Sequence, residues 1–284
     1  MRRGWRLALV VLGMSLLGGC SRLGIIDWLT PASGYTRVEG IAYGVGPRRR
    51  LDLYQPSTPL PAHPVVVFFY GGSWNSGERG NYRFVAQALA RRGILVVIAD
   101  YRLYPQVRYP QFLEDNAEAV AWVYRHVGAY GGDPQRLFLM GHSSGAYNVA
   151  MLALRPSLLG AVGLSPAIVK GWIGLAGPYD FLPVENEEVR PVFFYPDSPM
   201  DSQPIVHVHP GAPAALLLAA NKDTFVNPVR NTGGLARRLR EAGVPVRVAY
   251  FDRVDHASLV GAFAWPLRWM APVADEVVGF VDSH

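Results

Sequence analysis

Cysteine, excess charge of one sign and long apolar runs are all scarce in this sequence. Its 284 residues include one cysteine, Cys20, so no disulfide can form within the chain, and the cysteine count leaves the redox compartment undecided. No internal repeat or low-complexity tract is present, and half of the residues are hydrophobic. A sizeable core is therefore possible, extensive disorder is excluded, and the length suits one large α/β domain or two small ones.

The net charge of +5 comes largely from the N-terminus. Arg2, Arg3 and Arg6 lie in a segment that we expect to be removed, and without them 24 basic residues stand against 22 acidic ones, a balance of +2. A domain that binds nucleic acid usually carries a marked basic patch or stripe. We therefore expect no nucleic-acid partner.

The N-terminal segment has the pattern of a targeting signal. Residues 1–6 are basic and residues 7–17 are apolar, a run too short for a comfortable membrane span. Leu17-Gly18-Gly19 directly before Cys20 resembles a bacterial lipobox, in which the cysteine becomes lipidated. We therefore expect residues 1–19 to be a lipoprotein signal peptide and Cys20 to anchor the chain to a membrane. A plain secretory signal and a retained membrane anchor are the alternatives.

The residues after the cysteine bear on localisation and on where the domain begins. Ser21, rather than aspartate, follows Cys20, which resembles the outer-membrane sorting pattern of Gram-negative bacteria. We expect a lipid-anchored protein of the bacterial cell envelope, at the outer membrane and facing the periplasm. Residues 20–34 would form a tether that touches the domain through Ile25, Ile26 and Trp28, and residues 35–284 would form the domain.

Strand and helix patterns alternate through that domain. Apolar runs predict strands at 37–43, 50–54, 65–70, 94–99, 137–140, 172–176, 214–219 and 246–251. Amphipathic patterns predict helices at 81–92, within 109–130, and at 146–154, 228–242 and 270–281. This alternation predicts an α/β fold with a mostly parallel sheet and helices on both faces. Residues 181–204, rich in acids, aromatics and prolines, are expected to form a small cap insertion.

The strongest motif is Gly-His-Ser-Ser-Gly at 141–145, with an apolar strand before it and a helix after it. This context matches the Gly-x-Ser-x-Gly nucleophile elbow, in which a strained turn exposes the serine at the end of a strand. The glycines avoid Cβ clashes with the flanking segments, and the helix N-terminus favours negative charge. Ser143 is therefore the candidate nucleophile, with an ordinary Gly/Ser turn as the alternative.

A serine that attacks a carbonyl needs donors for the oxyanion that forms. Tyr-Gly-Gly-Ser-Trp at 70–74 completes a buried strand, and two glycines there let backbone N–H groups approach a substrate closely. Gly71 and Gly72 are the candidate donors on this side, and Ser144, directly after the nucleophile, is the candidate on the other. A plain strand-to-helix turn is the alternative for 71–72.

Four motifs in order carry a family resemblance: Tyr-Gly-Gly-Ser-Trp at 70–74, Asp-Tyr-Arg-Leu-Tyr-Pro at 100–105, Gly-Gly-Asp-Pro at 131–134 and Gly-His-Ser-Ser-Gly at 141–145. Together they resemble the carboxylesterase branch of the α/β-hydrolase superfamily, which includes hormone-sensitive-lipase-like, BD-FAE-like and arylformamidase-like enzymes. The resemblance spans about residues 38–280. Tyr70 departs from the pattern, because many relatives have histidine there.

The resemblance implies the chain order nucleophile, acid, base. His256, just after the last predicted strand, is the candidate base, while His142 is expected to point elsewhere. Asp223 resembles the acid of the family's Gly-x-x-Asp-x-x-Val-Pro loop, and Asp180, after the strand at 172–176, is the rival acid.

Several further residues have less specific readings. His-Val-His at 207–209 has metal-like spacing, but no Cys or carboxylate cluster accompanies it, so we expect a loop and no metal site. Asp100 and Arg102 are expected to pair with nearby charges. Trp74 and Tyr101 line a substrate pocket or belong to the core.

The resemblance implies a serine hydrolase that cleaves small-molecule carboxylic esters through an acyl-enzyme on Ser143, with no metal or organic cofactor. An arylformamidase-like amidase would use the same three residues. A non-catalytic binding protein on a hydrolase scaffold is the alternative from another class. The sequence does not decide the acyl length or the oligomeric state.

Overall fold

The computed structural model describes residue 26 and residues 29–284. The expected signal peptide at 1–19 and the lipidation site Cys20 lie outside the described residues, and the division of the chain into signal, tether and domain stays a prediction. Within the described part, no helix is both long enough and apolar enough to cross a membrane. The hydroxyl of Thr30 donates to the carbonyl oxygen of Ile26 at 2.9 Å, and both residues are buried.

Eight strands form one sheet in the order β1-β2-β4-β3-β5-β6-β7-β8. They are β1 (Tyr35–Ala42), β2 (Arg50–Pro56), β3 (His63–Phe69), β4 (Leu95–Ala99), β5 (Gly132–His142), β6 (Val169–Leu175), β7 (Ala214–Ala220) and β8 (Val246–Phe251). The pairs β1–β2 and β2–β4 are antiparallel, and every other neighbouring pair is parallel. The sheet therefore brings the carboxyl ends of β3, β5, β7 and β8 to one edge.

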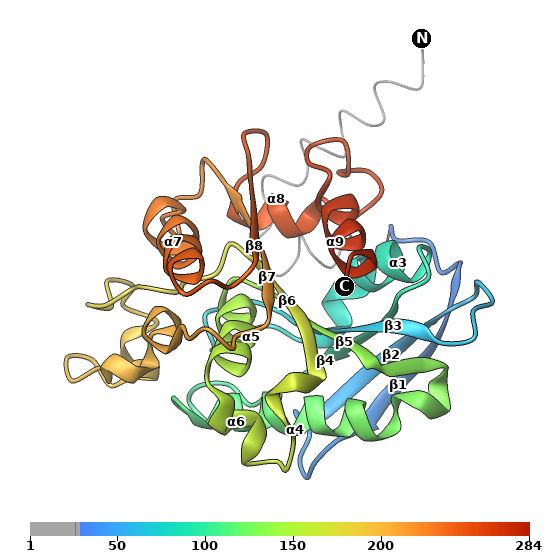
Figure 1. Cartoon of the computed structure of the whole chain (residues 1–284), viewed down its shortest axis with the longest axis horizontal. Helices are drawn as coiled ribbons and strands as arrows, with labels where there is room; N and C mark the ends of the chain where they lie inside the picture. The colour runs from blue at the N-terminus through green and yellow to red at the C-terminus, as the bar shows by residue number, and fades with distance from the viewer. Residues whose placement is uncertain (1–25, 27–28) are drawn as a thin grey trace.

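Helices cover both faces of the sheet (Figure 1). They are α3 (Arg83–Ala90), α4 (Gln111–His126), α5 (Ser144–Leu154), α6 (Pro156–Gly160), α7 (Gly234–Glu241), α8 (His256–Gly261) and α9 (Val273–Asp282). In Figure 1, α3 and α9 lie on one face, and α4 and α5 lie on the other. This arrangement confirms the predicted α/β-hydrolase fold.

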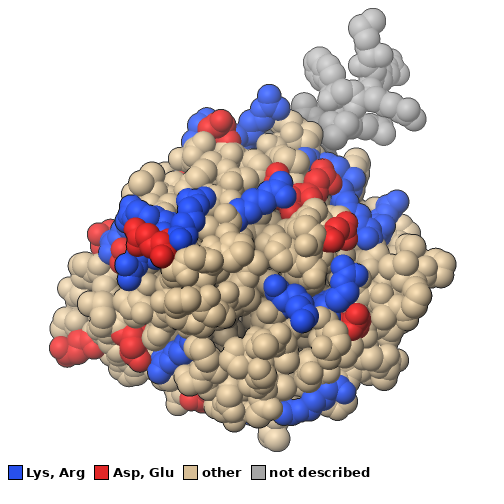
Figure 2. Space-filling view, in the orientation of Figure 1, with Lys and Arg blue, Asp and Glu red and all other residues tan. Residues whose placement is uncertain are grey.

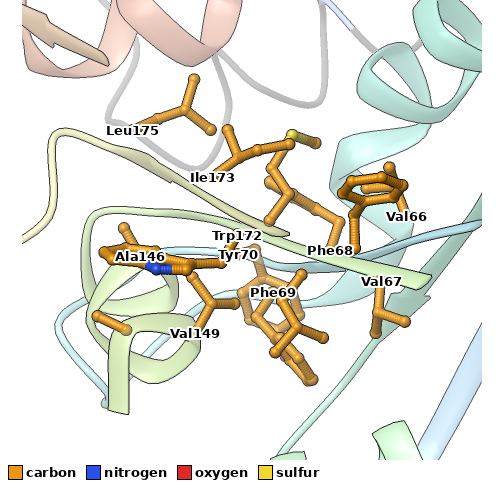
Figure 3. Packing of buried hydrophobic residues seen from close by; sticks show 14 of the residues in the cluster. Val66, Val67, Phe68, Phe69, Tyr70, Ala146, Val149, Trp172, Ile173 and Leu175 are labelled. Atoms are coloured by element: carbon orange, nitrogen blue, oxygen red, sulfur yellow. The ribbon is translucent and has the colours of Figure 1, made fainter. Parts of the chain in front are cut away.

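The core is built from continuous apolar strands that are buried on both faces, as parallel strands require. Val66 and Phe68 of β3 point toward one helix layer, and Val67 and Phe69 point toward the layer that contains α5 (Figure 3). These four side chains and Trp172 of β6 have no solvent-exposed surface. Burying one such side chain stabilises the fold by about 1.5–3 kcal/mol, so the central strands form a firm base for the loops at their ends.

Three helices differ from the sequence prediction. The helix predicted at 228–242 is divided into a π-helix, η8 (Val229–Gly233), and α7. Its first turn is shaped by Asn227, whose Oδ1 accepts from the backbone N–H groups of Val229 and Arg230, and the following glycine pair favours helix weakly. The short helices α6 and α8 were not predicted, because their five and six residues are too few to show a period.

The predicted cap segment, residues 181–204, contains no α-helix and is built around two 3₁₀-helices, η5 (Arg190–Phe193) and η6 (Met200–Ser202). A third, η7 (Pro204–His207), follows it. The hydroxyl of Tyr147 in α5 donates to the carbonyl oxygen of Ser202 at 2.7 Å. The segment therefore packs onto the helix that follows Ser143.

Basic and acidic side chains are intermixed over the face of the molecule seen in Figure 2, with wide uncharged areas between them. No broad field of one sign covers this face.

Candidate active site

Ser143 lies in the sharp turn between β5 and α5. Its backbone has φ 55° and ψ −123°, which is a strained conformation for a residue with a side chain. Its N–H donates to the carbonyl oxygen of Leu175 in β6 at 2.9 Å. A Cβ at Gly141 would overlap the backbone of Gly145, and one at Gly145 would overlap the carbonyl of Phe69 at the end of β3. The two glycines therefore let three backbone segments pack tightly around the strained serine.

Three side chains that follow different strands meet beside this turn. The Oγ of Ser143 lies 2.8 Å from Nε2 of His256, and Nδ1 of His256 lies 2.7 Å from Oδ2 of Asp223. Because a carboxylate only accepts hydrogen bonds, Nδ1 carries the proton and donates it to Asp223. Nε2 is then free to accept from the serine hydroxyl. This is a geometry in which an imidazole can take a proton from a serine.

The loop after β7 fixes the orientation of Asp223. Its Oδ1 accepts from the backbone N–H groups of Phe225 and Val226, both at 2.9 Å, while Oδ2 accepts from His256. Burial by itself raises the pKa of Asp223, but these hydrogen bonds outweigh burial and hold the pKa below the ordinary value for aspartate. The carboxyl group is therefore ionised at neutral pH and can stabilise a protonated His256.

The rival acid, Asp180, follows β6 and has a different partner. Its Oδ1 accepts from Nη2 of Arg230 at 3.1 Å, and its side chain is 36% exposed. The backbone N–H of Asp180 donates to Oδ1 of Asn231. Asp180 therefore forms an ion pair at the start of the cap segment, and Asp223 is the acid that lies beside His256.

Gly71 and Gly72 follow β3 and run along the serine. A Cβ at Gly71 would lie 2.9 Å from the Cβ of Ser143. Gly72 has a φ of 131°, and its carbonyl oxygen accepts from the N–H of Ser76 at 3.0 Å, which closes a tight turn. On the opposite side, Ser144 is the first residue of α5, so its N–H has no acceptor one turn earlier in the helix. The predicted oxyanion donors thus lie on both sides of Ser143.

A buried polar network supports this glycine turn from behind. The hydroxyl of Tyr70 donates to Oδ1 of Asp100 at 2.7 Å and accepts from Nη2 of Arg48 at 2.7 Å. The Tyr70 ring is fully buried and stacks on Tyr82 and Tyr101. Tyr70, which stands where many relatives have histidine, therefore holds the turn from within the core and presents no side-chain surface to solvent.

The same network continues to the end of the turn. Nη2 of Arg48 also donates to the carbonyl oxygen of Gly77 at 2.7 Å. The backbone N–H of Arg79 donates to Oδ1 of Asp100 at 2.8 Å, and the Arg79 guanidinium binds both Asp100 and Asp52. We refer to Arg48, Asp52, Tyr70, Arg79 and Asp100 together as the Arg–Asp network. Asp100 was expected to pair with nearby charges, and this is confirmed. The pair lies directly behind the predicted oxyanion donors.

His142 bonds to the backbone of His256 and not to the hydroxyl of Ser143. Its ring centroid is 5.0 Å from that of His256, and its Nε2 donates to the backbone carbonyl oxygen of His256 at 2.9 Å. The acceptor is a carbonyl, so Nε2 carries the proton, and the bare Nδ1 is buried with no hydrogen-bond partner in the described part of the chain. Burial, and then repulsion from His256, lowers the pKa of His142 to about 3. A neutral His142 therefore ties the start of α8 to the elbow.

Aromatic side chains pack together between the glycine turn after β3 and α5. The Trp74 ring lies against Tyr147, Phe181 and Phe193, with centroid distances of 5.1, 6.2 and 4.9 Å. Trp74 is 3% exposed and Tyr101 is fully buried, so both belong to the core rather than to an open pocket surface.

Phe225 has a position that the sequence did not single out. Its side chain is among the exposed large apolar groups, at 81%, and its ring centroid lies 5.4 Å from that of His256. The only signal in the sequence was its place two residues after Asp223. The exposed ring belongs to the surface that a substrate would meet next to His256.

Among residue 26 and residues 29–284, no group of three or more His, Cys, Asp or Glu side chains is arranged to hold a metal ion. His207 of the His-Val-His pattern lies in η7, and its Nε2 donates to the carbonyl oxygen of Asp201 at 2.6 Å.

Comparison with known proteins places this geometry in a class. The fold is shared with esterase B from Lactobacillus rhamnosis, whose structure was solved with a tributyrin phosphonate inhibitor. The two structures superpose with a TM-score of 0.81 at 18% sequence identity, and the match covers 100% of this chain and 96% of the other. The α/β-hydrolase fold, the elbow serine and the adjacent imidazole define an enzyme class, the α/β-hydrolases. Within this class, the BD-FAE family model matches residues 51–239, and the chain belongs to the BD-FAE family.

Two curated relatives bear names of ester-cleaving enzymes. A probable isoprenylcysteine alpha-carbonyl methylesterase of Oryza sativa subsp. japonica is 34% identical over 183 residues, covering 63% of this chain and 42% of the relative. The probable carboxylic ester hydrolase LipM of Mycobacterium tuberculosis is 29% identical over 244 residues, covering 78% and 56%. The chain thus spans about half the length of the curated relatives that it matches.

Proposed function

We propose that this chain hydrolyses carboxylic esters through an acyl-enzyme on Ser143. The observation that carries the proposal is the continuous line of hydrogen bonds from the serine Oγ to His256 at 2.8 Å and from His256 to Asp223 at 2.7 Å. The esterase names of the relatives support an ester as the substrate rather than the amide of an arylformamidase.

The proposed reaction has two halves. As Oγ of Ser143 attacks the ester carbonyl, Nε2 of His256 takes the hydroxyl proton, and the oxyanion accepts from the N–H groups of Gly71, Gly72 and Ser144. His256 then gives its proton to the leaving alcohol, which leaves the acyl group on the serine. A water molecule, deprotonated by His256 in turn, attacks the acyl carbonyl, and the released Oγ recovers the proton.

Asp223 acts throughout this cycle on His256. Its carboxylate holds Nδ1–H, which keeps Nε2 directed at Ser143, and its charge stabilises the imidazolium formed in each half-reaction. His142 acts as a positioning residue, because it holds the backbone from which the His256 side chain projects.

We also propose that the chain is a lipoprotein, anchored through Cys20 in the bacterial cell envelope and facing the periplasm. The support is the basic and apolar N-terminal segment that ends in Leu17-Gly18-Gly19-Cys20.

The test of the enzymatic proposal compares two serines. Wild-type protein should react with a fluorophosphonate probe and hydrolyse p-nitrophenyl esters faster than N-formyl arylamines. Ser143→Ala should lose probe labelling and lower kcat on the order of 10⁶-fold. Ser144→Ala is the matched control, because it keeps its backbone N–H, and it should retain substantial activity.

Each outcome separates one alternative. Faster cleavage of N-formyl arylamines would favour the amidase, and a folded wild-type protein without labelling or turnover would favour a binding protein. Activity in Ser143→Ala together with loss in Ser144→Ala would move the nucleophile.

A further inference from the structure

We propose that the loop between α8 and α9 docks on the surface of a phospholipid bilayer. The proposal rests on the lipid anchor proposed at Cys20, and its test treats the two separately. We call residues 265–270, with the sequence Trp-Pro-Leu-Arg-Trp-Met, the Trp loop. Trp265 is 52% exposed and Trp269 is 68% exposed.

Among the tryptophans that the structure describes, only Trp265 and Trp269 are largely exposed. Trp74 and Trp172 are buried in the core, and Trp122 is partly buried against it. Two largely exposed tryptophans within five residues place a large apolar area in contact with water, which marks an interaction site. Tryptophan is enriched where protein meets the membrane–water interface, because its ring is apolar and its N–H is polar.

The N-terminal segment meets the Trp loop. Nε1 of Trp265 lies 3.4 Å from the carbonyl oxygen of Leu29, within hydrogen-bond distance. Three residues earlier, Ile26 is buried as part of the hydrophobic core. Ile26 lies six positions after Cys20, with five residues between them, and six extended residues span at most about 20 Å. A lipid on Cys20 would therefore hold the side of the domain that carries the Trp loop close to the bilayer.

Charge near the Trp loop fits an anionic headgroup layer. Arg253 and Arg268 are exposed, and both line a shallow cavity of about 400 Å³ together with Trp269. Asp252 also lines this cavity, and its Oδ1 accepts from Nδ2 of Asn221, so the charged side chains lining it sum to +1. Burial of the apolar rings would supply most of the free energy of binding, and the guanidinium groups of Arg253 and Arg268 would add electrostatic attraction to acidic lipids.

The test uses the full-length protein in vesicles of phosphatidylethanolamine and phosphatidylglycerol, made with or without brominated acyl chains that quench nearby tryptophans. Wild-type emission should fall in the brominated vesicles. The double variant Trp265→Phe/Trp269→Phe should lose at least half of the quenched intensity. Trp122→Phe, on α4 at the opposite face of the sheet, is the matched control and should leave the quenched intensity unchanged.

Folding and lipidation are measured on the same samples. Hydrolysis of a soluble p-nitrophenyl ester should be unchanged in both variants, since neither lies in the proposed catalytic machinery. Incorporation of an alkyne-tagged fatty acid reports the lipid on Cys20 directly. A lipidated wild type whose quenching does not depend on Trp265 and Trp269 would overturn the docking surface and leave the anchor standing. An unlipidated protein that still shows the quenching when vesicles are added would overturn the anchor alone.

Discussion

On the triad side of the candidate active site, the loops after β5, β7 and β8 bring Ser143, Asp223 and His256 into a single line of hydrogen bonds. On the oxyanion side, the turn after β3 is supported by the Arg–Asp network, in which each carboxylate accepts from several donors. The first arrangement leaves one nitrogen, Nε2 of His256, ready to accept a proton. The second leaves its carboxylates saturated with donors, so its charges fix backbone positions and do no proton transfer.

This contrast separates two kinds of substitution. A change on the triad side should reduce turnover at nearly constant stability, because its side chains are supported by loop backbone. A change on the oxyanion side should reduce stability first, because it takes a cation or a hydrogen-bond donor away from buried carboxylates.

The largest effect on turnover is expected from substitution of Asp223. Asp223→Asn should lower kcat on the order of 10⁴-fold, because an amide no longer holds Nδ1–H of His256 in the productive tautomer. Asp180→Asn removes only an exposed ion pair with Arg230 and should change kcat less than about tenfold. The measurement is kcat together with the melting temperature of both variants. A folded, inactive Asp180→Asn beside an active Asp223→Asn would move the acid to Asp180.

The next effect is expected in the Arg–Asp network. Arg79→Met should cost about 3 kcal/mol in the free energy of unfolding, because Asp52 and Asp100 are both buried and both lose a cation. Arg91→Met, at the exposed C-terminal end of α3, is the control for removing an arginine. Urea unfolding gives the free energies. An Arg79→Met protein with wild-type stability and much lower kcat would contradict the assignment of stability to the oxyanion side and of turnover to the triad side.

His142 lies between the two sides, and its contribution should appear in the pH dependence of the unfolding free energy. The unfolded chain binds a proton at His142 near pH 6.5, whereas the native pKa is about 3, so native stability falls as the pH drops below 6.5. Between pH 6.5 and 4.5 this residue should cost the wild type about 2 kcal/mol more than it costs His142→Gln, whose side chain does not titrate. Denaturant melts at both pH values give the difference. Identical pH dependence in the two proteins would count against a buried, neutral His142.

The smallest effect is expected at the N-terminus of α8. Oδ1 of Asp255 accepts from the backbone N–H of Ser258 at 2.8 Å, and the Ser258 hydroxyl accepts from the N–H of Asp255, forming a capping box around His256. Asp255→Ala should cost about 1 kcal/mol in unfolding free energy and lower kcat only a few-fold. Asp252→Ala, exposed and outside the capping box, is the control. If the two variants unfold at the same urea concentration, the capping box makes no contribution.

The fold and most of the site could be predicted from the sequence where the signal was local. Continuous apolar runs gave the strands, and the glycines at 141 and 145 identified the elbow, because only residues without a Cβ fit its packing. Ser143, Asp223 and His256 were selected by motif and order, and they lie within hydrogen-bond distance of one another. The roles assigned to them stay predictions.

The parts that could not be predicted depend on contacts between distant segments. The hydrogen bond from His142 to the carbonyl oxygen of His256 joins residues 114 positions apart, and no sequence pattern around residue 142 predicts it. The exposed Phe225 was missed because periodicity reports burial along a helix or strand and says nothing of a loop. The division of the helix at 228–242 follows from Asn227 and a glycine pair, whose effect depends on the neighbouring loop.

The tight packing of the elbow has a consequence for anyone who wishes to change the specificity by directed evolution. Side chains at positions 141 and 145 would collide with backbone, and backbone cannot rotate aside as a flexible side chain can. Libraries that include those codons would consist mostly of unfolded clones, whatever ester is used for selection. Phe181, in a loop against Trp74, and Phe225, in a loop beside His256, offer a small library with far more folded members.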